Sequence, residues 1–354
     1  MIYYFLLELQ HHLSFLRVIE SVSFRAMAAF LTALILSFIS GGWFIETSKR
    51  FFRAAVRAHT PASHQAKNNT PTMGGIFIVT VVISTIFLWC KLSDPHVVII
   101  LFTLFLFAGI GFWDDWMKIH YKRGLTEKTK WGAQLIAGTL VIAAWHFLLP
   151  PLTTVCIPLF KQINPDLGIA YYLWALFVLV GTCNAVNLTD GLDGLASSAL
   201  LPNFATFSLI AYCAGHALFA RYLHIPFVGT AEIAIIGAIL IGACLGFLWY
   251  NTYPAQIFMG DVGALSLGAA LGMMALMTKQ EILLILSGIV FVGETLSVIV
   301  QVVGFKIFKV RIFKIAPIHH HFEKLGWPEM KITVRASIIT IIACLCALML
   351  LKIR

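Results

Sequence analysis

The chain has 354 residues, of which 60% are hydrophobic and 12% are charged. A typical soluble domain is about 45–50% apolar and about 25% charged, so this composition excludes a water-soluble globule, a disordered chain and a coiled coil. The net charge of +9 is typical of basic membrane-protein loops that face the cytoplasm, and it does not by itself indicate nucleic-acid binding. We therefore expect one polytopic membrane domain covering residues 1–354.

Apolar runs long enough to cross a bilayer occur ten times along the chain. A helix needs about 20 mostly apolar residues to span roughly 30 Å of hydrocarbon. The predicted fold class is all-α, with about ten transmembrane helices. In chain order they are expected at Phe24–Ile45, Met73–Leu92, His96–Trp113, Trp131–Leu149, Ala170–Val186, Gly194–Tyr212, Ala231–Trp249, Asp261–Met277, Ile282–Phe305 and Arg335–Leu351.

The loops between these spans fall into two sets that differ in positive charge. One set carries 16 Lys and Arg residues, and the alternate set, which includes both chain ends, carries seven. The positive-inside rule places the first set in the cytoplasm and both termini on the outer side of the membrane. The predicted cytoplasmic loops are approximately 46–72, 114–130, 187–193, 250–260 and 306–334.

Four clusters of polar residues lie on this predicted cytoplasmic face. A random distribution would have put about half of them on the other face. Carboxylates near hydrocarbon are costly, about 2.5–3.5 kcal/mol for Asp at a helix centre and less toward its ends. The clusters place five aspartates near helix ends, where they would repel one another unless cations neutralise them: Asp114, Asp115, Asp190, Asp193 and Asp261.

Oxygen ligands with room for phosphate predict a Mg²⁺ site at these acids. Mg²⁺ binds one or two carboxylates together with substrate phosphates and keeps several waters. The nearby Lys and His residues supply complementary charge for phosphates. Acids, bases and Mg²⁺ at a membrane surface therefore predict phosphoryl transfer between a soluble and a lipid substrate.

Each cluster also has a simpler structural interpretation. An acid pair at a helix end, such as Asp114–Asp115, is usually solvated. Asp193 and Asp261 could be the N-caps of the sixth and eighth spans. Thr72 could cap the second span, whose first amides could otherwise bind an anion. A zinc site at His319–His321 is disfavoured, because three consecutive residues cannot all face one metal on a helix or strand.

Two further patterns predict contacts with lipid or between helices. The basic and apolar segment Phe305–Ile315 predicts an interfacial helix that guides an anionic lipid substrate or serves as a general membrane anchor. Gly288 in the ninth span permits a kink that would open a lateral groove. The spacing of Gly268 and Gly272 would let helices pack closely, within the fold or between subunits.

At these residues the sequence resembles the phospho-N-acetylmuramoyl-pentapeptide-transferase family of the polyprenyl-phosphate N-acetylhexosamine-1-phosphate transferase superfamily. The superfamily shares the aspartate pair and the NxxDGxDGL element, whereas the triple-histidine loop is similar to the muramoyl-pentapeptide branch in particular. The matching segments are PTMGG (71–75), DDWMK (114–118), NAVNLTDGLDGLA (184–196), NTYPAQIFMGDVGALSLG (251–268), ETLSVIVQV (294–302) and APIHHHFEKLGWPE (316–329).

This resemblance implies a ten-helix enzyme of the bacterial inner membrane, usually a homodimer, with periplasmic termini and a cytoplasmic active-site cleft. The implied reaction is Mg²⁺-dependent transfer of phospho-N-acetylmuramoyl-pentapeptide from UDP-MurNAc-pentapeptide to undecaprenyl phosphate. UMP would leave, and the first lipid intermediate of peptidoglycan synthesis would remain in the membrane. The partners are these two substrates and membrane lipid, with no nucleic acid.

The resemblance also implies roles for individual residues. Asp261 would be the Mg²⁺ ligand, and the catalytic candidates are Asp114, Asp115, Asp261 and His320. Phe258 is a candidate to stack on uracil. The expected substrate-binding residues are Lys67, Thr72, Lys118, Lys122, Lys130, Asn187, Asp190, Gly191, Asp193, Asn251, Phe258, Gln301, His319 and His321.

Two alternative functions account for part of the pattern. A transferase of GlcNAc-1-phosphate to the same lipid belongs to the same superfamily, but the triple-histidine loop argues against it. An ion-coupled transporter would place ionisable groups near the bilayer midplane, often on broken helices in repeated halves. Here the acids cluster at one face, which favours the enzyme.

Overall fold

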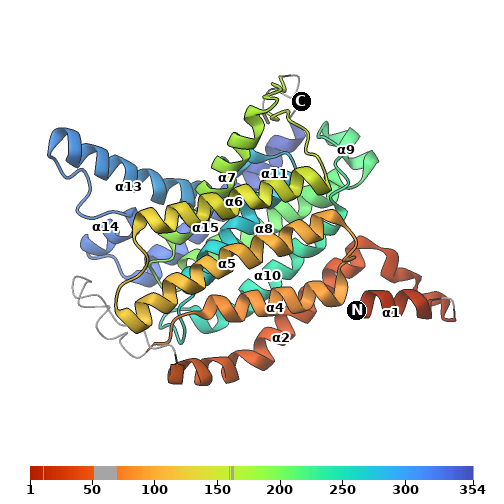
Figure 1. Cartoon of the computed structure of the whole chain (residues 1–354), viewed down its shortest axis with the longest axis horizontal. Coiled ribbons are helices and arrows are strands. Elements are labelled where there is room, and N and C mark those ends of the chain that lie inside the picture. Colours follow the sequence, from red (N-terminus) through yellow and green to blue (C-terminus); the bar gives the residue numbers. More distant parts are fainter. Residues whose placement is uncertain (11, 52–69, 159, 161–162, 354) are drawn as a thin grey trace.

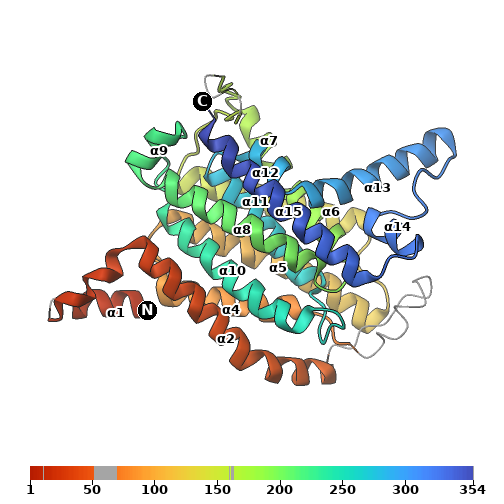
Figure 2. The ribbon, with the colours of Figure 1, turned by 180° about the vertical axis from the view of Figure 1, so that it is seen from behind.

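The computed structural model describes residues 1–354 except 11, 52–69, 159, 161–162 and 354. The described part of the chain is a bundle of helices without a named strand, and its one isolated antiparallel bridge joins Thr154 and Asp166 (Figures 1 and 2). The elements are α1 Ile2–Leu9, η1 Ser14–Glu20, α2 Val22–Phe51, α4 Gly74–Trp89, α5 Pro95–Tyr121, α6 Glu127–Leu148, α7 Ala170–Thr189, α8 Leu195–Ala214, α9 Ala217–Leu223, α10 Ala231–Asn251, α11 Gly260–Met277, α12 Glu281–Ser287, α13 Ile289–Phe308, α14 Ile318–Lys324 and α15 Glu329–Lys352.

Every predicted span corresponds to helix in the structure. Within the described residues, nine helices are long and apolar enough to cross a membrane. The second predicted span is α4, which is apolar but has only 16 residues, or about 24 Å at 1.5 Å per residue. The prediction of an all-α polytopic membrane protein is confirmed.

Several helices, α5 and α6 among them, extend further toward the polar clusters than their apolar runs predict. α5 continues to Tyr121, and α6 begins at Glu127 rather than Trp131. The side chain of Thr126 caps α6 by accepting a backbone hydrogen bond at 3.3 Å. Hydropathy identifies the part of a helix that lies in lipid, whereas the helix itself continues into charged sequence. The Asp114–Asp115 pair therefore lies on helix α5 and not in a loop.

Helix α11 lies at the centre of the bundle. All of its residues in Val262–Met277 are buried, and it packs mainly against α5 and α7. A Cβ atom at Gly268 would lie 2.9 Å from Cα of Cys183, and one at Gly272 would lie 3.3 Å from Cα of Leu179. The two glycines thus let α11 approach α7 closely, so their spacing serves packing within the fold.

The ninth predicted span is broken at Gly288, as its glycine predicted. α12 ends at Ser287, α13 begins at Ile289, and α13 leans away from the rest of the bundle (Figures 1 and 2). An apolar groove of about 290 Å³ lies between α7 and this broken span. Its walls include Phe177, Gly181, Ala185, Phe291, Thr295 and Leu296.

The predicted interfacial helix over Phe305–Ile315 is wrong beyond Phe308. Lys309 adopts a left-handed conformation (φ 55°) that ends α13, and an irregular segment then leads to α14. Gln301 holds this segment in place. Its side-chain amide donates to the backbone oxygen of Phe313 at 3.1 Å and accepts from the N–H of Phe313 at 2.9 Å. The side-chain amide of Gln301, a predicted substrate contact, is therefore engaged within the fold.

Candidate active site

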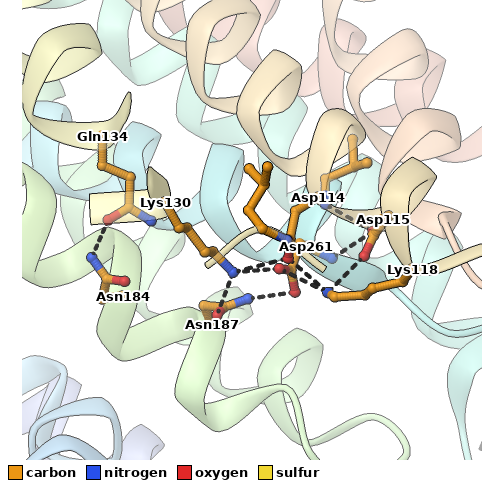
Figure 3. A network of polar contacts seen from close by, with 10 residues as sticks. Asp114, Asp115, Lys118, Lys130, Gln134, Asn184, Asn187 and Asp261 are labelled. Atoms are coloured by element: carbon orange, nitrogen blue, oxygen red, sulfur yellow. Dashed lines mark hydrogen bonds and ion pairs between the residues drawn. The ribbon is translucent and has the colours of Figure 1, made fainter. Parts of the chain in front are cut away.

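Three aspartates from two helices converge at one end of the bundle. Asp114 and Asp115 lie near the C-terminal end of α5, and Asp261 is the second residue of α11. The charge of the loops predicts that this end of α5 faces the cytoplasm. One carboxylate oxygen from each lies within 4.8 Å of the others. Figure 3 shows the three side chains directed toward one another between Lys118 and Lys130. The predicted gathering of these acids is confirmed, and their catalytic roles stay predictions.

Lys118 and Lys130 make this density of negative charge tolerable. Two like charges about 4.8 Å apart repel by roughly 3–4 kcal/mol at an effective dielectric constant near 20. Nζ of Lys118 lies 2.8 Å from Asp114 and 3.0 Å from both Asp115 and Asp261. Lys130 pairs with Asp261 and lies 3.4 Å from Asp114. Two predicted substrate-binding lysines thus belong to the acid cluster itself.

Asp115 also fixes the start of α11. Its Oδ2 accepts the backbone N–H groups of Asp261 at 2.8 Å and Val262 at 3.4 Å. A carboxylate is favourable at a helix N-terminus, where backbone donors have no partner within the helix. Gly260 has φ 72°, and a Cβ there would lie 2.5 Å from this oxygen. The alternative that Asp261 caps α11 is wrong, because Asp115 satisfies these donors.

Asp114 is buried and holds the turn between α5 and α6. Its side chain is only 4% exposed, so the solvated interpretation of the acid pair is wrong. Oδ1 accepts the N–H of Leu125 at 2.6 Å, and a Cβ at Gly124 would lie 2.7 Å from the same oxygen. Oδ2 faces the two lysines. One oxygen of Asp114 therefore orders the turn, and the other is directed into the cluster.

Amide side chains on α6 and α7 connect to the cluster. Asn187, a predicted substrate residue, donates to Oδ1 of Asp261 at 2.9 Å, and Nζ of Lys130 lies 3.4 Å from its Oδ1. Deeper in the bundle, Asn184 donates to Gln134 at 2.6 Å (Figure 3). The sequence reasoning assigned no role to this pair, although two amides within apolar spans were a usable signal. The pair fixes the spacing of the helices that carry Lys130 and Asn187.

Asp190 follows the end of α7 and faces the cluster. It is half-buried. Desolvation, followed by the negative charges of Asp261 and Asp115, raises the pKa of Asp190 well above its ordinary range.

Asp193 joins two loops and does not cap α8. The N-cap of α8 is Gly194, with φ 73° and no side-chain hydrogen bond, so the capping alternative is wrong. The carboxylate of Asp193 accepts the N–H of Ala255 at 3.0 Å, and its own N–H donates to Glu329 at 2.6 Å. Glu329, the first residue of α15, was not predicted to be near the site.

Asn251 and Phe258 shape the loop before α11. Oδ1 of Asn251 accepts the N–H of Gly194 at 3.1 Å, and its Nδ2 donates to the carbonyl of Ile257 at 2.9 Å. The N–H of Phe258 donates to the carbonyl of Pro71 at 2.9 Å, and its side chain is half-buried. Both residues hold the loop at the site, while nucleotide contact by either one stays a prediction.

Thr72 does not cap α4. The N-cap is Met73, with φ 67° and no side-chain hydrogen bond. The amides of Gly74–Gly75 donate to the carbonyls of residues 258–259 at 2.8 and 2.7 Å. These amides are therefore not available to an anion, and the alternative anion site is wrong. Oγ1 of Thr72 would lie 3.1 Å from a Cβ at Gly260, so Thr72 is at the edge of the acid cluster.

The three histidines lie in the first turn of α14, and the rings of His319 and His320 are 4.2 Å apart. His319 is buried and lies against Gly191, where an added Cβ would overlap its Nε2. Each ring uses Nδ1 for a different partner: His319 for Glu294 at 3.0 Å, His320 for Glu323 at 2.6 Å, and His321 for the N–H of Lys314 at 3.1 Å.

The two other predicted basic residues, Lys122 and Lys67, have no described contact with the cluster. Lys122 is exposed and ends α5 in a left-handed conformation with φ 55°. Lys67 lies outside the described residues. Their roles as substrate contacts stay predictions.

Comparison with known proteins gives matches that include the region of the acid cluster. The model of Glycosyl transferase family 4 matches residues 97–279, which include all three clustered aspartates and both lysines. The model of Phospho-N-acetylmuramoyl-pentapeptide-transferase signature 1 matches residues 67–79. Phospho-N-acetylmuramoyl-pentapeptide-transferase from Solidesulfovibrio magneticus is 46% identical over 359 aligned positions, which cover the full length of both chains.

Proposed function

The chain belongs to the phospho-N-acetylmuramoyl-pentapeptide-transferase family, and from that premise we propose that the acid cluster is the Mg²⁺-dependent active site. The substrates are UDP-MurNAc-pentapeptide and undecaprenyl phosphate. UMP is released, and the sugar remains linked to the lipid through a diphosphate. The observation that carries this proposal is the convergence of Asp114, Asp115 and Asp261 within 4.8 Å around Lys118.

The donor set fits Mg²⁺. All three groups offer carboxylate oxygens, which Mg²⁺ prefers, and their spacing leaves room for water and phosphate ligands. Asp261 is the proposed principal ligand, as the family resemblance implies. Its described partners are the side chains of Asn187, Lys118 and Lys130, whereas Asp115 and Asp114 each commit one oxygen to backbone amides. When bound, Mg²⁺ would neutralise charge on the diphosphate. Lys118 and Lys130 would then bind phosphate oxygens.

The nucleophile is an oxygen of the lipid phosphate, so no strong base is required. A phosphate monoester has its second pKa near 6 and is mostly dianionic at pH 7. This oxygen attacks the sugar-linked phosphorus, the bond from that phosphorus to the bridging oxygen breaks, and UMP leaves with the electron pair. Asp114 positions the lipid phosphate, and catalysis comes from charge neutralisation and alignment.

The apolar groove beside α7 is the proposed path of the lipid chain. It lies along the helix that carries Asn187 at its last turn, and Thr182 and Ala185 line it. A hydrocarbon chain in the groove can thus place its phosphate at the cluster. The basic loops support an active site in the cytoplasm, periplasmic termini and location in the inner membrane. A single catalytic domain that forms a homodimer completes the proposal.

The test is an assay of the purified protein with UDP-MurNAc-pentapeptide, polyprenyl phosphate and Mg²⁺. UMP release that depends on all three is expected, and EDTA should abolish it. UDP-GlcNAc serves as the comparison donor in the same assay, in place of UDP-MurNAc-pentapeptide. Equal or faster UMP release from UDP-GlcNAc would favour the sister transferase, and no release from either donor would reject the transferase reaction.

Replacing Asp114 with Asn should lower turnover by about 100-fold or more at every pH, because positioning requires the charged oxygen. Asn keeps an oxygen for the Leu125 amide, so the turn after α5 should remain intact. The measurement is UMP release from pH 6 to pH 10, with the wild-type profile as control. Recovery of the variant at alkaline pH, where the lipid phosphate is fully ionised, would show that Asp114 acts as a general base.

A further inference from the structure

A buried acid on α13 contacts the histidine loop. Glu294 is 4% exposed, and its Oε2 lies 3.0 Å from Nδ1 of His319. The same oxygen accepts the backbone N–H of His319 at 3.3 Å. One carboxylate oxygen thus holds both the ring and the backbone of the residue. The neighbours of Glu294 in sequence, Thr295 and Leu296, line the apolar groove.

The other edge of the His319 ring is pressed against Gly191. Nε2 is buried and has no hydrogen-bond partner in the part of the chain that the structure describes, and a Cβ at Gly191 would lie 2.8 Å from Cε1 of the ring. An ionised carboxylate only accepts hydrogen bonds, so Nδ1 carries the proton on the Glu294 side. In the neutral ring, Nε2 then directs a lone pair at the Gly191 backbone. Only glycine leaves room for this contact.

The turn that contains Gly191 carries residues of the proposed nucleotide side. Asp190 faces the aspartate cluster, and Asp193 fixes the loop before α11 through the N–H of Ala255. A shift of His319 would therefore displace both Asp190, at the aspartate cluster, and Asp193, at the loop before α11. Glu294 determines where His319 lies, because among the described residues it is the only hydrogen-bond partner of a ring that is 1% exposed.

We propose that Glu294 is a positioning residue of the active site. It holds His319 against Gly191 in one tautomer, and this contact fixes the 190–193 turn for binding of the uridine nucleotide. The residue also joins groove helix α13 to that turn. The inference rests on the proposed function, and it adds a residue that reaches no substrate itself.

Replacing Glu294 with Ala should weaken binding of UMP by about 10-fold, because Nδ1–H loses its acceptor and the ring is released from the turn. UMP binding is measured by calorimetry and does not require turnover. In the enzyme assay, KM for UDP-MurNAc-pentapeptide should rise by about the same factor, with KM for polyprenyl phosphate within about twofold. Glu294→Gln should recover most of the binding, because its carbonyl oxygen accepts the same N–H.

Glu232→Ala is the matched control. Glu232 is also a buried acid that pairs with a basic side chain and a backbone amide, Arg25 at 2.6 Å and Lys91 at 3.0 Å. This change should lower thermal stability without weakening UMP binding. The double variant Glu294→Ala with His319→Ala should bind UMP no worse than His319→Ala alone. Each single change already removes the same contact between Glu294 and His319, so the two effects should not add.

The results distinguish this inference from the proposed function. Unchanged UMP affinity in Glu294→Ala, an equal rise in both KM values, or failure of Glu294→Gln to recover binding would each overturn the positioning role. A wild-type protein that binds UMP but releases none from UDP-MurNAc-pentapeptide would reject the proposed function. The effect of Glu294→Ala on UMP affinity would still decide the inference in that case.

Discussion

Replacing Asp261 with Asn is expected to lower kcat by about 10³-fold while the protein stays folded. Asp261 accepts from Asn187 at 2.9 Å and from Lys118 at 3.0 Å, and it pairs with Lys130. Asn can keep only the Asn187 contact, because its NH₂ group would then face two ammonium groups. The N-terminus of α11 should remain in place, since Asp115 binds the backbone N–H of residue 261 and not its side chain.

The measurement is UMP release across a Mg²⁺ titration, with thermal stability recorded for each protein. Asp166→Asn is the control, because Asp166 is an exposed acid that accepts from Thr153 at 2.5 Å and from the N–H of Gly168. Its turnover should equal that of the wild type. Wild-type turnover by Asp261→Asn at every Mg²⁺ concentration would contradict both the metal-ligand role and the charge argument.

The membrane architecture was predictable from sequence because it depends on local composition. Each span is a continuous apolar run, and the polar clusters follow from where those runs end. The gathering of Asp114, Asp115 and Asp261 followed from placing their loops on one face. The hydrogen bond that the N–H of Asp261 donates to Asp115 was not predictable in this way. Its partners are 146 residues apart, and hydropathy does not specify which helix ends touch.

The capping predictions failed for one physical reason. Thr72 and Asp193 have side chains that commonly cap a following helix, and local sequence rules assume such a partner. In the folded chain the first amides of α4 donate to the carbonyls of residues 258–259, and Asp193 accepts from Ala255 instead. Tertiary contacts therefore replaced the local ones. The sequence identifies Glu294 as an acid within an apolar span, but it does not indicate that Glu294 pairs with His319.

A methyl group at Gly111 is expected to lower kcat by about 100-fold. In Gly111→Ala the new Cβ would lie 2.5 Å from the carbonyl carbon of Asp261 and 2.6 Å from Cα of Val262. Both are backbone atoms, so no side-chain rotation relieves the overlap, and α5 must move away from α11. This movement would stretch the 2.8 Å hydrogen bond that the N–H of Asp261 donates to Asp115. A misplacement of about 1 Å is enough to reduce turnover by about 10²-fold.

Gly109→Ala is the matched control on the same helix. A Cβ at Gly109 has no heavy atom within 4 Å among the described residues, so only helix propensity changes there, in favour of Ala. UMP release and thermal unfolding should show an active Gly109→Ala protein. Gly111→Ala should be less stable by about 1–3 kcal/mol, the usual effect of overpacking. Overpacking by itself lowers stability, whereas a change in kcat reports movement of the site residues. A folded Gly111→Ala protein with wild-type kcat would therefore contradict the proposed geometry, because the site would tolerate separation of α5 from α11.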